Sequence, residues 1–303
     1  MNQKKVSIII PTYKDWNRLS LCLNALEAQS YDSDLFEIII VNNYPNAKIP
    51  ANYFLPKNCL VIVEGKPGSY AARNAGITMA TGNIIGFTDS DCIPDVNWIK
   101  NAVLFMEANT DCDRIAGSIK LYYHSNKLTE AELYEKIYAF NEDIYVHQDG
   151  TGVTGNMFSY RHVFDAVGVF RDDLMSGGDY EWSIRAKDNG YKIKYAEDVI
   201  VNHPARQNIS ELIKKAKKIG GGQSGFNPPP DQNKFQAIVS FLYDLRPPIK
   251  SIKLIAQKGK DLHITQKVTV FYIRYYLSII TAREKFTVSF GKNSERQKVL
   301  HHT

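Results

Sequence analysis

The first third of the chain alternates short apolar runs with stretches of helical spacing. Uninterrupted apolar runs of this length are typical of strands that are buried on both faces of a sheet. They lie at residues 6–10, 37–41, 60–63 and 84–88. Between them, residues 16–30 carry leucines three and four positions apart, and residues 69–81 are rich in alanine. This alternation predicts an α/β fold with a doubly wound, mostly parallel sheet flanked by helices.

The pattern becomes less regular after residue 120. Apolar spacing there predicts helices at 128–140, 179–189 and 210–219, and strands at 191–195 and 199–202. The segment 151–160 is first interrupted by glycines and then resembles a strand. Gly190 and the glycines at 220–222 stand where C-caps would end the second and third of these helices. The three prolines at 228–230 predict a hinge, and two amphipathic stretches follow at 235–245 and 268–280.

Composition limits the class of protein. A chain of 303 residues that is 44% hydrophobic can bury a sizeable core, which excludes a disordered protein. The four cysteines form no CxxC pair, so we expect neither a zinc-thiolate site nor a disulfide scaffold, and reduced thiols favour a cytoplasmic protein. No run reaches the roughly 18 apolar residues of a membrane-spanning helix. The longest run, at 268–281, is interrupted by Arg274, so secretion and a transmembrane anchor are disfavoured.

The charge is distributed unevenly. Residues 1–205 hold 19 Lys and Arg against 26 Asp and Glu, a net charge of −7, whereas residues 206–303 hold 18 against 6, a net charge of +12. A basic segment of this kind indicates an anionic partner. We expect an anionic membrane surface or an anionic, lipid-linked acceptor, and no nucleic acid, because no nucleic-acid-binding motif accompanies the charge. In the alternative interpretation, residues 268–280 pack on the rest of the protein and the lysines form a solvated face.

Pairs of aspartates two positions apart are the first candidates for chemistry. Three such pairs occur, and they are Asp32 with Asp34, Asp89 with Asp91, and Asp111 with Asp113. Only the pair at 89 and 91 directly follows a predicted buried strand, at the sheet edge where ligands bind in this fold class. Two carboxylates there can hold a divalent cation, Mn²⁺ or Mg²⁺, which in turn holds a diphosphate. We interpret the other two pairs as solvated turns.

Two further positions carry candidate groups. Asp179 and Glu181 follow a pair of glycines at the start of a predicted helix, where Asp179 either caps the helix or faces a cleft. His203 stands at a predicted strand end, either as a structural residue or facing a metal or phosphate together with Arg206. Residues 220–225 match the GxGxxG spacing, but they lack the preceding strand that a dinucleotide site needs, so we reject that function.

Four segments, taken in order, resemble the family 2 glycosyltransferases of GT-A fold. They are 6–13 (VSIIIPTY), 72–76 (ARNAG), 87–92 (FTDSDC) and 178–185 (GDYEWSIR), and the resemblance covers roughly residues 5–205. It implies inverting, metal-dependent transfer of a sugar from a nucleotide-diphosphate donor. The implied acceptor is a hydroxyl of a glycan or lipid-linked molecule, and the implied setting is the synthesis of a surface polysaccharide.

The resemblance also implies roles for donor-binding residues. Pro11 and Thr12 match the segment that closes over the nucleotide base, and Arg73 matches an arginine near the base and phosphates. Asp89 matches the residue that holds the ribose, and Asp91 matches the main metal ligand.

The same resemblance implies residues for the acceptor side. Asp179 matches the catalytic base, although Gly178 stands where the family usually has glutamate. Glu181 matches a second acid of this motif, which we assign with Arg206 to the acceptor or a phosphate. His203 resembles a histidine that lies against the metal or diphosphate in some members.

One departure from the family concerns the nucleobase. The family usually has aspartate at the end of the second strand, where this chain has Asn42 and Asn43. An amide can donate as well as accept a hydrogen bond, so we assign Asn43 to donor binding and expect a base other than uracil, for example guanine.

The resemblance divides the chain into three parts. Residues 1–120 would bind the nucleotide sugar, residues 121–205 the acceptor, and residues 206–303 would form a basic, mainly helical extension. We expect a cytoplasmic enzyme with a peripheral position at the inner face of the cell membrane. Two alternatives are a nucleotide-sugar-binding protein of the same fold without turnover, and a sugar nucleotidyltransferase, which would need a glycine-rich loop after the first strand.

Overall fold

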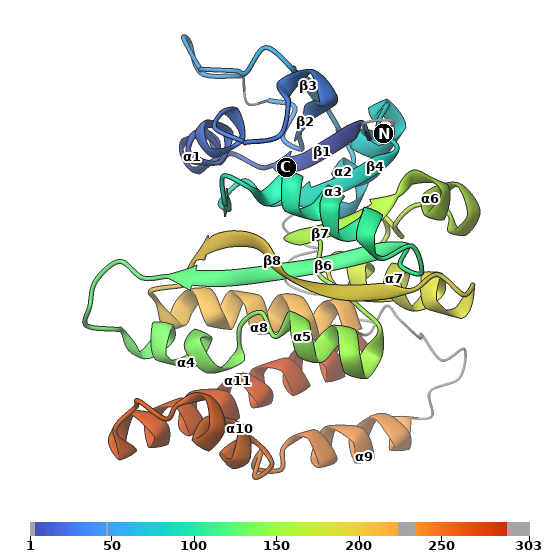
Figure 1. The fold of residues 1–303 in the computed structure, drawn as a ribbon. Coiled ribbons are helices and arrows are strands. Elements are labelled where there is room, and N and C mark those ends of the chain that lie inside the picture. The colour runs from blue at the N-terminus through green and yellow to red at the C-terminus, as the bar shows by residue number, and fades with distance from the viewer. Residues whose placement is uncertain (1–3, 47, 224–233, 290–303) are drawn as a thin grey trace. The chain divides into compact units, whose positions relative to one another are not determined.

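A mixed β-sheet forms the frame of the protein. The computed structural model describes residues 4–46, 48–223 and 234–289, and in this part of the chain eight strands form a sheet in the order β3-β2-β1-β4-β7-β6-β8-β5 (Figure 1). The strands are β1 (Val6–Thr12), β2 (Phe36–Asn42), β3 (Cys59–Val63), β4 (Ile84–Thr88), β5 (Ile93–Pro94), β6 (Arg114–Tyr122), β7 (Asn156–Tyr160) and β8 (Ile193–Pro204). The predicted α/β fold is thereby confirmed.

The N-terminal strands form the parallel part of the sheet. Strand β1 pairs in parallel with β2 and β4, and β2 pairs in parallel with β3. The crossovers contain helices α1 (Trp16–Glu27) and α2 (Ser69–Met79), close to the predicted ranges. The expectation that residues 60–63 form a strand buried on both faces was wrong. They belong to β3, which lies at the edge of the sheet. Leu60 and Val63 are therefore exposed on it.

The remaining strands pair in antiparallel fashion. Strand β7 pairs with β4 and β6, and β5 pairs with β8. The two short strands expected at 191–195 and 199–202 are one continuous strand, β8. Ala196 lies in the gap between the two predicted strands, and Val199 begins the second of them. Both are buried in the core, so the buried strand continues through the expected gap.

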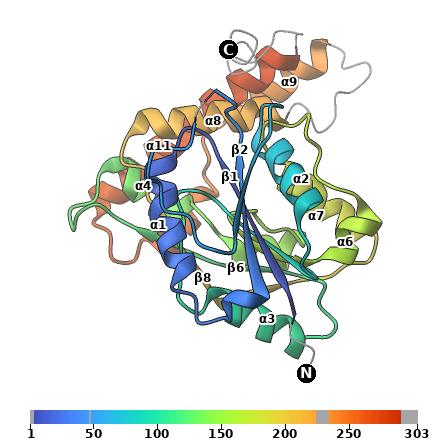
Figure 2. The ribbon, with the colours of Figure 1, turned by 90° about the horizontal axis from the view of Figure 1, so that it is seen from above.

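Helices cover both faces of the sheet. Figure 2 shows α1 and α3 (Trp98–Ala108) on one side, and α2, α6 (Arg161–Val167) and α7 (Gly178–Asp188) on the other. Alternate residues of β1 point to opposite faces of the sheet. Ile8 and Ile10 pack in the hydrophobic cluster with α1 and α3, whereas Ile9 faces α2. Helix α2 comes so close that a Cβ on Gly76 would lie 2.5 Å from Cγ2 of Ile9.

The described chain divides into two compact units, which we treat separately. The sheet unit comprises Met1–Lys120, Phe140–Asp173 and Gly178–His203, and the helical unit comprises Leu121–Ala139, Leu174–Gly177 and Pro204–Thr303. The longer helices of the helical unit are α4 (Glu130–Tyr138), α8 (Ile209–Gln223), α9 (Lys234–Asp244), α10 (Ser251–Lys258) and α11 (Ile264–Ser289). Short helical turns of the sheet unit are η1 (Ser33–Leu35), α5 (Glu142–Ile144) and η2 (Tyr145–Asp149).

Helix α11 forms the centre of the helical unit. It packs on α4 and α8 around a core of Ala131, Leu212, Ala216, Ile273 and Leu277. The predicted cap at 220–222 was wrong, since α8 continues through these glycines. A Cβ on Gly220 would lie 2.6 Å from the carbonyl oxygen of Thr281, so this glycine allows α8 and α11 to approach closely.

The two amphipathic stretches expected in the tail correspond to α9 and to the middle of α11. The proline hinge expected at 228–230 lies outside the described residues. None of the helices that the structure describes combines the length and the apolar character of a bilayer-crossing segment.

Candidate active site

The carboxyl ends of three parallel strands meet at one edge of the sheet. The register sets Thr12, the last residue of β1, opposite Asn42, the last residue of β2. Strand β4 ends at Thr88, and Asp89 follows it directly. Thr12 and Thr88 are buried, and neither side-chain hydroxyl has a hydrogen-bond partner among the described residues. Buried polar atoms are normally paired, so these hydroxyls mark the edge as a place for a ligand.

Arg73 and Asp89 form a close pair at this edge. Arg73 lies on α2 and is 4% exposed, and its Nη2 donates to Oδ1 of Asp89 at 2.5 Å. The Nε of Arg73 is buried and has no partner in the described part of the chain. The structure thus brings together two residues that the sequence assigned to the donor, and it leaves one buried N–H donor beside them.

Asp91 lies next to His203. The Nε2 atom of His203 is 3.7 Å from Oδ1 of Asp91, and the imidazole ring packs on Phe140 with a centroid distance of 4.7 Å. Burial raises the pKa of Asp91 above its usual value, His203 opposes this rise, and Asp89 adds to it. Of the two interpretations of His203, the structure therefore supports a position beside the predicted metal ligand.

The residues around Asp91 fit a divalent cation. Ligand atoms of Asp91, Cys92 and His203 lie within 4.8 Å of one another. Cys92 is fully buried, and burial raises the pKa of its thiol well above the ordinary value. Sulfur is also a soft ligand, and Mn²⁺ and Mg²⁺ prefer oxygen and nitrogen donors, so Cys92 is the weakest candidate of the three. One carboxylate and one imidazole remain, a donor set that suits Mn²⁺ and leaves positions for diphosphate oxygens.

Two charged residues near Asp91 were missed in the sequence. The Nη1 atom of Arg18 lies 3.3 Å from Oδ2 of Asp91, and Nη2 of the same guanidinium lies 2.8 Å from Oδ2 of Asp15. An acid and an arginine three positions apart at the start of α1 were the available signal. The guanidinium adds positive charge where two carboxylates come close together.

Asp179 lies in the first turn of α7, where the helix dipole favours a carboxylate. Its Oδ1 atom accepts a hydrogen bond from the Tyr70 hydroxyl at 3.1 Å and another from the backbone N–H of Tyr180 at 3.0 Å. Tyr70 is buried, and burial raises the pKa of its hydroxyl, so it remains a donor. Asp179 is therefore oriented by a side chain from α2, as well as by its own helix.

Gly178 explains how the chain departs from the family motif. A Cβ at this position would lie 2.8 Å from the ring of Tyr70, well inside van der Waals contact. Tyr70 also packs on Phe170, with a centroid distance of 5.8 Å. Glycine in place of glutamate thus makes room for the tyrosine that binds Asp179.

Comparison with known proteins identifies the family. Residues 7–168, more than half of the chain, match the family model described as Glycosyl transferase family 2. The chain belongs to glycosyltransferase family 2. Glycosyltransferase AglE of Haloferax volcanii is 36% identical over 223 residues, which is 72% of each chain.

More distant relatives of this glycosyltransferase have more specific names. A Methanococcus voltae protein, 20% identical over 232 residues and 72% of each chain, is named dolichyl N-acetyl-alpha-D-glucosaminyl phosphate 3-beta-D-2,3-diacetamido-2,3-dideoxy-beta-D-glucuronosyltransferase. The structure of the mannosyltransferase PcManGT from Pyrobaculum calidifontis, in complex with GDP-Man and Mn²⁺, matches with a TM-score of 0.54 at 15% identity. It covers 100% of this chain and 79% of that one. At this identity the likeness shows the GT-A fold alone.

Two residues expected at the acceptor or a phosphate have other contacts in the glycosyltransferase. Glu181 pairs with Arg185 one turn along α7, at 3.0 Å, and Arg185 in turn donates to the carbonyl oxygens of Val167 and Val169. Arg206 belongs to the helical unit, where its Nη1 donates to Oε1 of the buried Glu135 at 2.6 Å. Their assignment to an acceptor or phosphate stays a prediction.

Asn43 holds a loop beside the site. Its amide nitrogen donates to the carbonyl oxygens of Glu64 and Lys66, at 2.9 and 2.8 Å, and its Oδ1 accepts from the backbone N–H of Gly68 at 2.9 Å. This loop leads directly into α2, which carries Arg73. Asn43 is therefore connected through the backbone to α2 and to Arg73, which is predicted to bind the donor.

An aromatic pair next to Thr12 was not predicted. Tyr13 and Tyr44 meet edge to face with a centroid distance of 5.4 Å, and the Nζ of Lys14 lies 3.8 Å from the Tyr44 centroid. Tyr13 is half exposed. Because β1 and β2 end side by side, the residues that follow them bring these rings together.

Glu142 is a buried acid that sequence reasoning also missed. It is 2% exposed, its Oε2 accepts from the backbone N–H of Val153 at 3.2 Å, and its Oε1 has no partner within the described ranges. Burial raises its pKa to about 8, the Val153 hydrogen bond opposes this, and Asp179 adds to the rise. The raised pKa favours the protonated form at neutral pH, and Asp179 is close enough to contribute to the rise.

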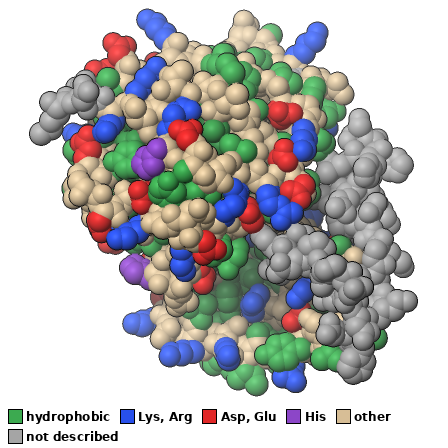
Figure 3. Space-filling view, turned by 90° about the vertical axis from the view of Figure 1, so that its right-hand side faces the viewer, with side chains coloured by type: hydrophobic (Ala, Val, Ile, Leu, Met, Phe, Trp, Pro, Cys, Tyr) green, Lys and Arg blue, Asp and Glu red, His purple; other side chains and the backbone are tan. Residues whose placement is uncertain are grey.

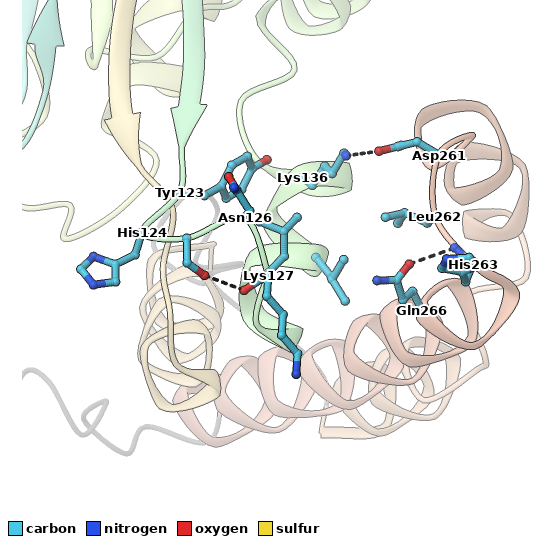
Figure 4. Close-up of a pocket in the computed structure, with 12 residues that line it drawn as sticks. Tyr123, His124, Asn126, Lys127, Lys136, Asp261, Leu262, His263 and Gln266 are labelled. Carbon is cyan, nitrogen blue, oxygen red and sulfur yellow. Dashed lines mark hydrogen bonds and ion pairs between the residues drawn. The ribbon is translucent and has the colours of Figure 1, made fainter.

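A separate cavity of about 800 Å³ belongs to the helical unit (Figure 4). Lys136 and Asp261 form an ion pair on its wall, and His263 donates its backbone N–H to Gln266 at 2.9 Å. Its lining includes no residue predicted for the donor, the metal or the base. The cavity is therefore not the candidate active site.

Proposed function

We propose that this glycosyltransferase is an inverting, metal-dependent enzyme that transfers a sugar from a nucleotide-diphosphate donor to an acceptor hydroxyl. The main support for the proposal is that a single helix contacts both the residues assigned to the donor and the residue assigned as base. Helix α2 provides both Arg73, which binds Asp89, and Tyr70, which binds Asp179. The donor-binding residues and the proposed base are thereby held by the same rigid element.

Donor binding is assigned to the strand-end residues. Pro11 and Thr12 would lie against the nucleobase, with Asp89 on the ribose and Arg73 supplying charge toward the phosphates. The neighbouring pair of tyrosines offers an aromatic surface for stacking a base. PcManGT, which has the same fold, contains GDP-Man in its structure, and this supports a nucleotide-sugar donor here.

Asp91 and His203 would hold the divalent cation, Mn²⁺ or Mg²⁺. A cation bound there would supply Lewis-acid stabilisation of the departing diphosphate. The presence of Mn²⁺ in PcManGT supports this assignment. Arg18, which is 3.3 Å from Asp91, adds positive charge at the same position.

Asp179 would take the proton of the acceptor hydroxyl. Its Oδ1 already accepts two hydrogen bonds, so we assign the proton to Oδ2. As the proton leaves, the acceptor oxygen attacks the anomeric carbon and the bond to the diphosphate breaks. A single displacement of this kind inverts the anomeric centre and needs no covalent intermediate on the enzyme.

The acceptor is proposed to be a glycan or a lipid-linked molecule in the synthesis of a surface polysaccharide. The name of the Methanococcus voltae relative, which begins with dolichyl N-acetyl-alpha-D-glucosaminyl phosphate, supports the lipid-linked form. Glu181 would act there through Arg185, which it orients, and Arg206 would contribute charge. A cytoplasmic enzyme at the inner face of the cell membrane could reach such an acceptor.

The test is the release of nucleoside diphosphate from a panel of nucleotide sugars, with and without Mn²⁺. We expect release to depend on the metal and to stop in EDTA. Calorimetry with the same panel separates binding from turnover. Tight metal-dependent binding without release, in the presence of a range of glycan and lipid-linked acceptors, would favour a binding protein and contradict the proposal.

A further inference from the structure

Helix α9 exposes its apolar face. On one side, Ala237 is buried and Phe241 packs on Phe286 of α11, with a centroid distance of 4.7 Å. The opposite side carries four large apolar residues that are between 44% and 62% exposed, namely Ile238, Val239, Leu242 and Tyr243. Their spacing of one, three and four places them on one helical face.

The exposed apolar surface continues beyond α9. Ile249 and Ile252 are 69% and 54% exposed, and each is followed by an exposed lysine, Lys250 or Lys253. Arg246 lies over the ring of Tyr243, with a distance of 4.5 Å to the centroid. Basic and apolar side chains thus alternate along the segment from α9 to α10.

Helix α11 adds a third apolar stripe. Ile264, Val268, Tyr272 and Tyr276 are four positions apart and are all exposed. The hydroxyl of Tyr275, next to Tyr276, donates to the carbonyl oxygen of Leu245 at 3.0 Å. This hydrogen bond joins the middle of α11 to the residue that follows α9, so the two apolar stripes belong to neighbouring helices of the helical unit.

We propose that this surface of α9, α10 and α11, which we call the basic apolar face, docks on an anionic lipid membrane. Residues 234–289 hold ten Lys and Arg and three Asp and Glu, a net charge of +7. Two of the three acids are paired, Asp244 with Lys285 and Asp261 with Lys136. Within the helical unit, Figure 3 shows hydrophobic and basic side chains side by side along its lower edge.

The positive charge of the basic apolar face favours an anionic membrane over a second copy of the chain as its partner. Two basic faces of equal charge would repel each other, whereas anionic headgroups would neutralise the lysines and the acyl region would take the exposed side chains. The proposal rests on the proposed function for its purpose, because a lipid-linked acceptor would lie in the same membrane. Docking itself does not require turnover.

The experiment is sedimentation of the full chain with phosphatidylcholine vesicles, with and without phosphatidylglycerol, at low and high salt. We expect binding that needs phosphatidylglycerol and weakens at high salt. Leu242→Asp combined with Ile249→Asp should weaken binding by about tenfold or more. Lys250→Glu combined with Lys253→Glu should remove the preference for phosphatidylglycerol.

The matched control is Leu104→Asp on α3, where the leucine is 53% exposed, against 60% for Leu242. It should bind vesicles as the unchanged protein does. Absence of vesicle binding, or equal binding by the control and the Leu242→Asp, Ile249→Asp variant, would overturn the proposal. A dimer that this variant dissociates would overturn it in favour of a second copy. Release of nucleoside diphosphate with a soluble acceptor should be the same in all variants. Its absence from the unchanged protein, beside normal vesicle binding, would count against the proposed function alone.

Discussion

The substitution Glu142→Gln tests the buried acid beside Asp179. Glu142 has a pKa of about 8 in the folded protein, against an ordinary value of 4.5, because burial and the charges of Asp179 and Asp143 disfavour its ionised form. The Val153 N–H acts in the opposite direction, and the hydroxyl of Tyr145 is a further titratable neighbour. Glutamine has nearly the shape of the protonated acid and cannot ionise.

The difference between the folded and the ordinary pKa of Glu142 determines how the free energy of unfolding changes with pH. A carboxyl group with a raised folded pKa contributes stability that is fully present below pH 4.5 and is lost as the pH rises through about 8. At about 1.4 kcal/mol for each pH unit, the free energy of unfolding should fall by about 3 kcal/mol from this group by neutral pH, and by about 5 kcal/mol well above pH 8. Glu142→Gln should not lose this stability.

The assay is urea unfolding of both proteins at about pH 5, 7 and 9. The variant should gain stability over the unchanged protein, and the gain should grow with pH. Glu27→Gln, at an exposed glutamate of α1, controls for the loss of a carboxylate and should show no such growth. A difference between Glu142→Gln and the unchanged protein that stays constant from pH 5 to 9 would refute the reasoning.

Three further predictions concern the metal, the donor loop and the helical unit. Asp91→Ala should abolish metal-dependent release of nucleoside diphosphate, and circular dichroism should show that the variant is folded. Full activity of the unchanged enzyme in EDTA would contradict the metal site. Asn43→Asp loses two N–H donors to part-buried loop carbonyls, so calorimetry should show weaker binding of every nucleoside diphosphate, by about tenfold or more. Unchanged binding would show that the loop does not need these two hydrogen bonds. Gly220→Ala should lower the free energy of unfolding by about 1–3 kcal/mol, because its Cβ would meet the Thr281 carbonyl, and a stabilised variant in urea unfolding would contradict the packing.

Local patterns predicted the first half of the fold well. A strand buried on both faces needs an uninterrupted apolar run, and β1, β2 and β4 have such runs and are fully or mostly buried. The position of a strand in the sheet is not a local property, so β3 was not recognised as an edge strand. The glycines of α8 gave the signal of a cap, whereas the role of Gly220 depends on its contact with Thr281 of α11, about sixty residues further along the chain.

The residues of the candidate site that stand in sequence motifs could be predicted. Those that reach the site through contacts distant in the sequence could not. Asp89, Asp91 and Asp179 stand in recognisable segments. Tyr70 and Asp179 are 109 positions apart, and no spacing rule connects them. Glu142 likewise is one glutamate in a polar stretch of sequence, and only the fold reveals that its side chain is buried.

The central claim is that Asp179 is the general base of a glycosyl transfer. The most direct measurement is the turnover of Asp179→Asn with a donor and acceptor that the unchanged enzyme uses, beside calorimetric binding of the same donor. Asparagine retains an oxygen that can accept from Tyr70, but it is not a base. We predict that turnover falls by on the order of 10²-fold or more while donor binding is unchanged. Normal turnover of the asparagine variant would contradict the claim and reduce Asp179 to a structural residue of the first turn of α7.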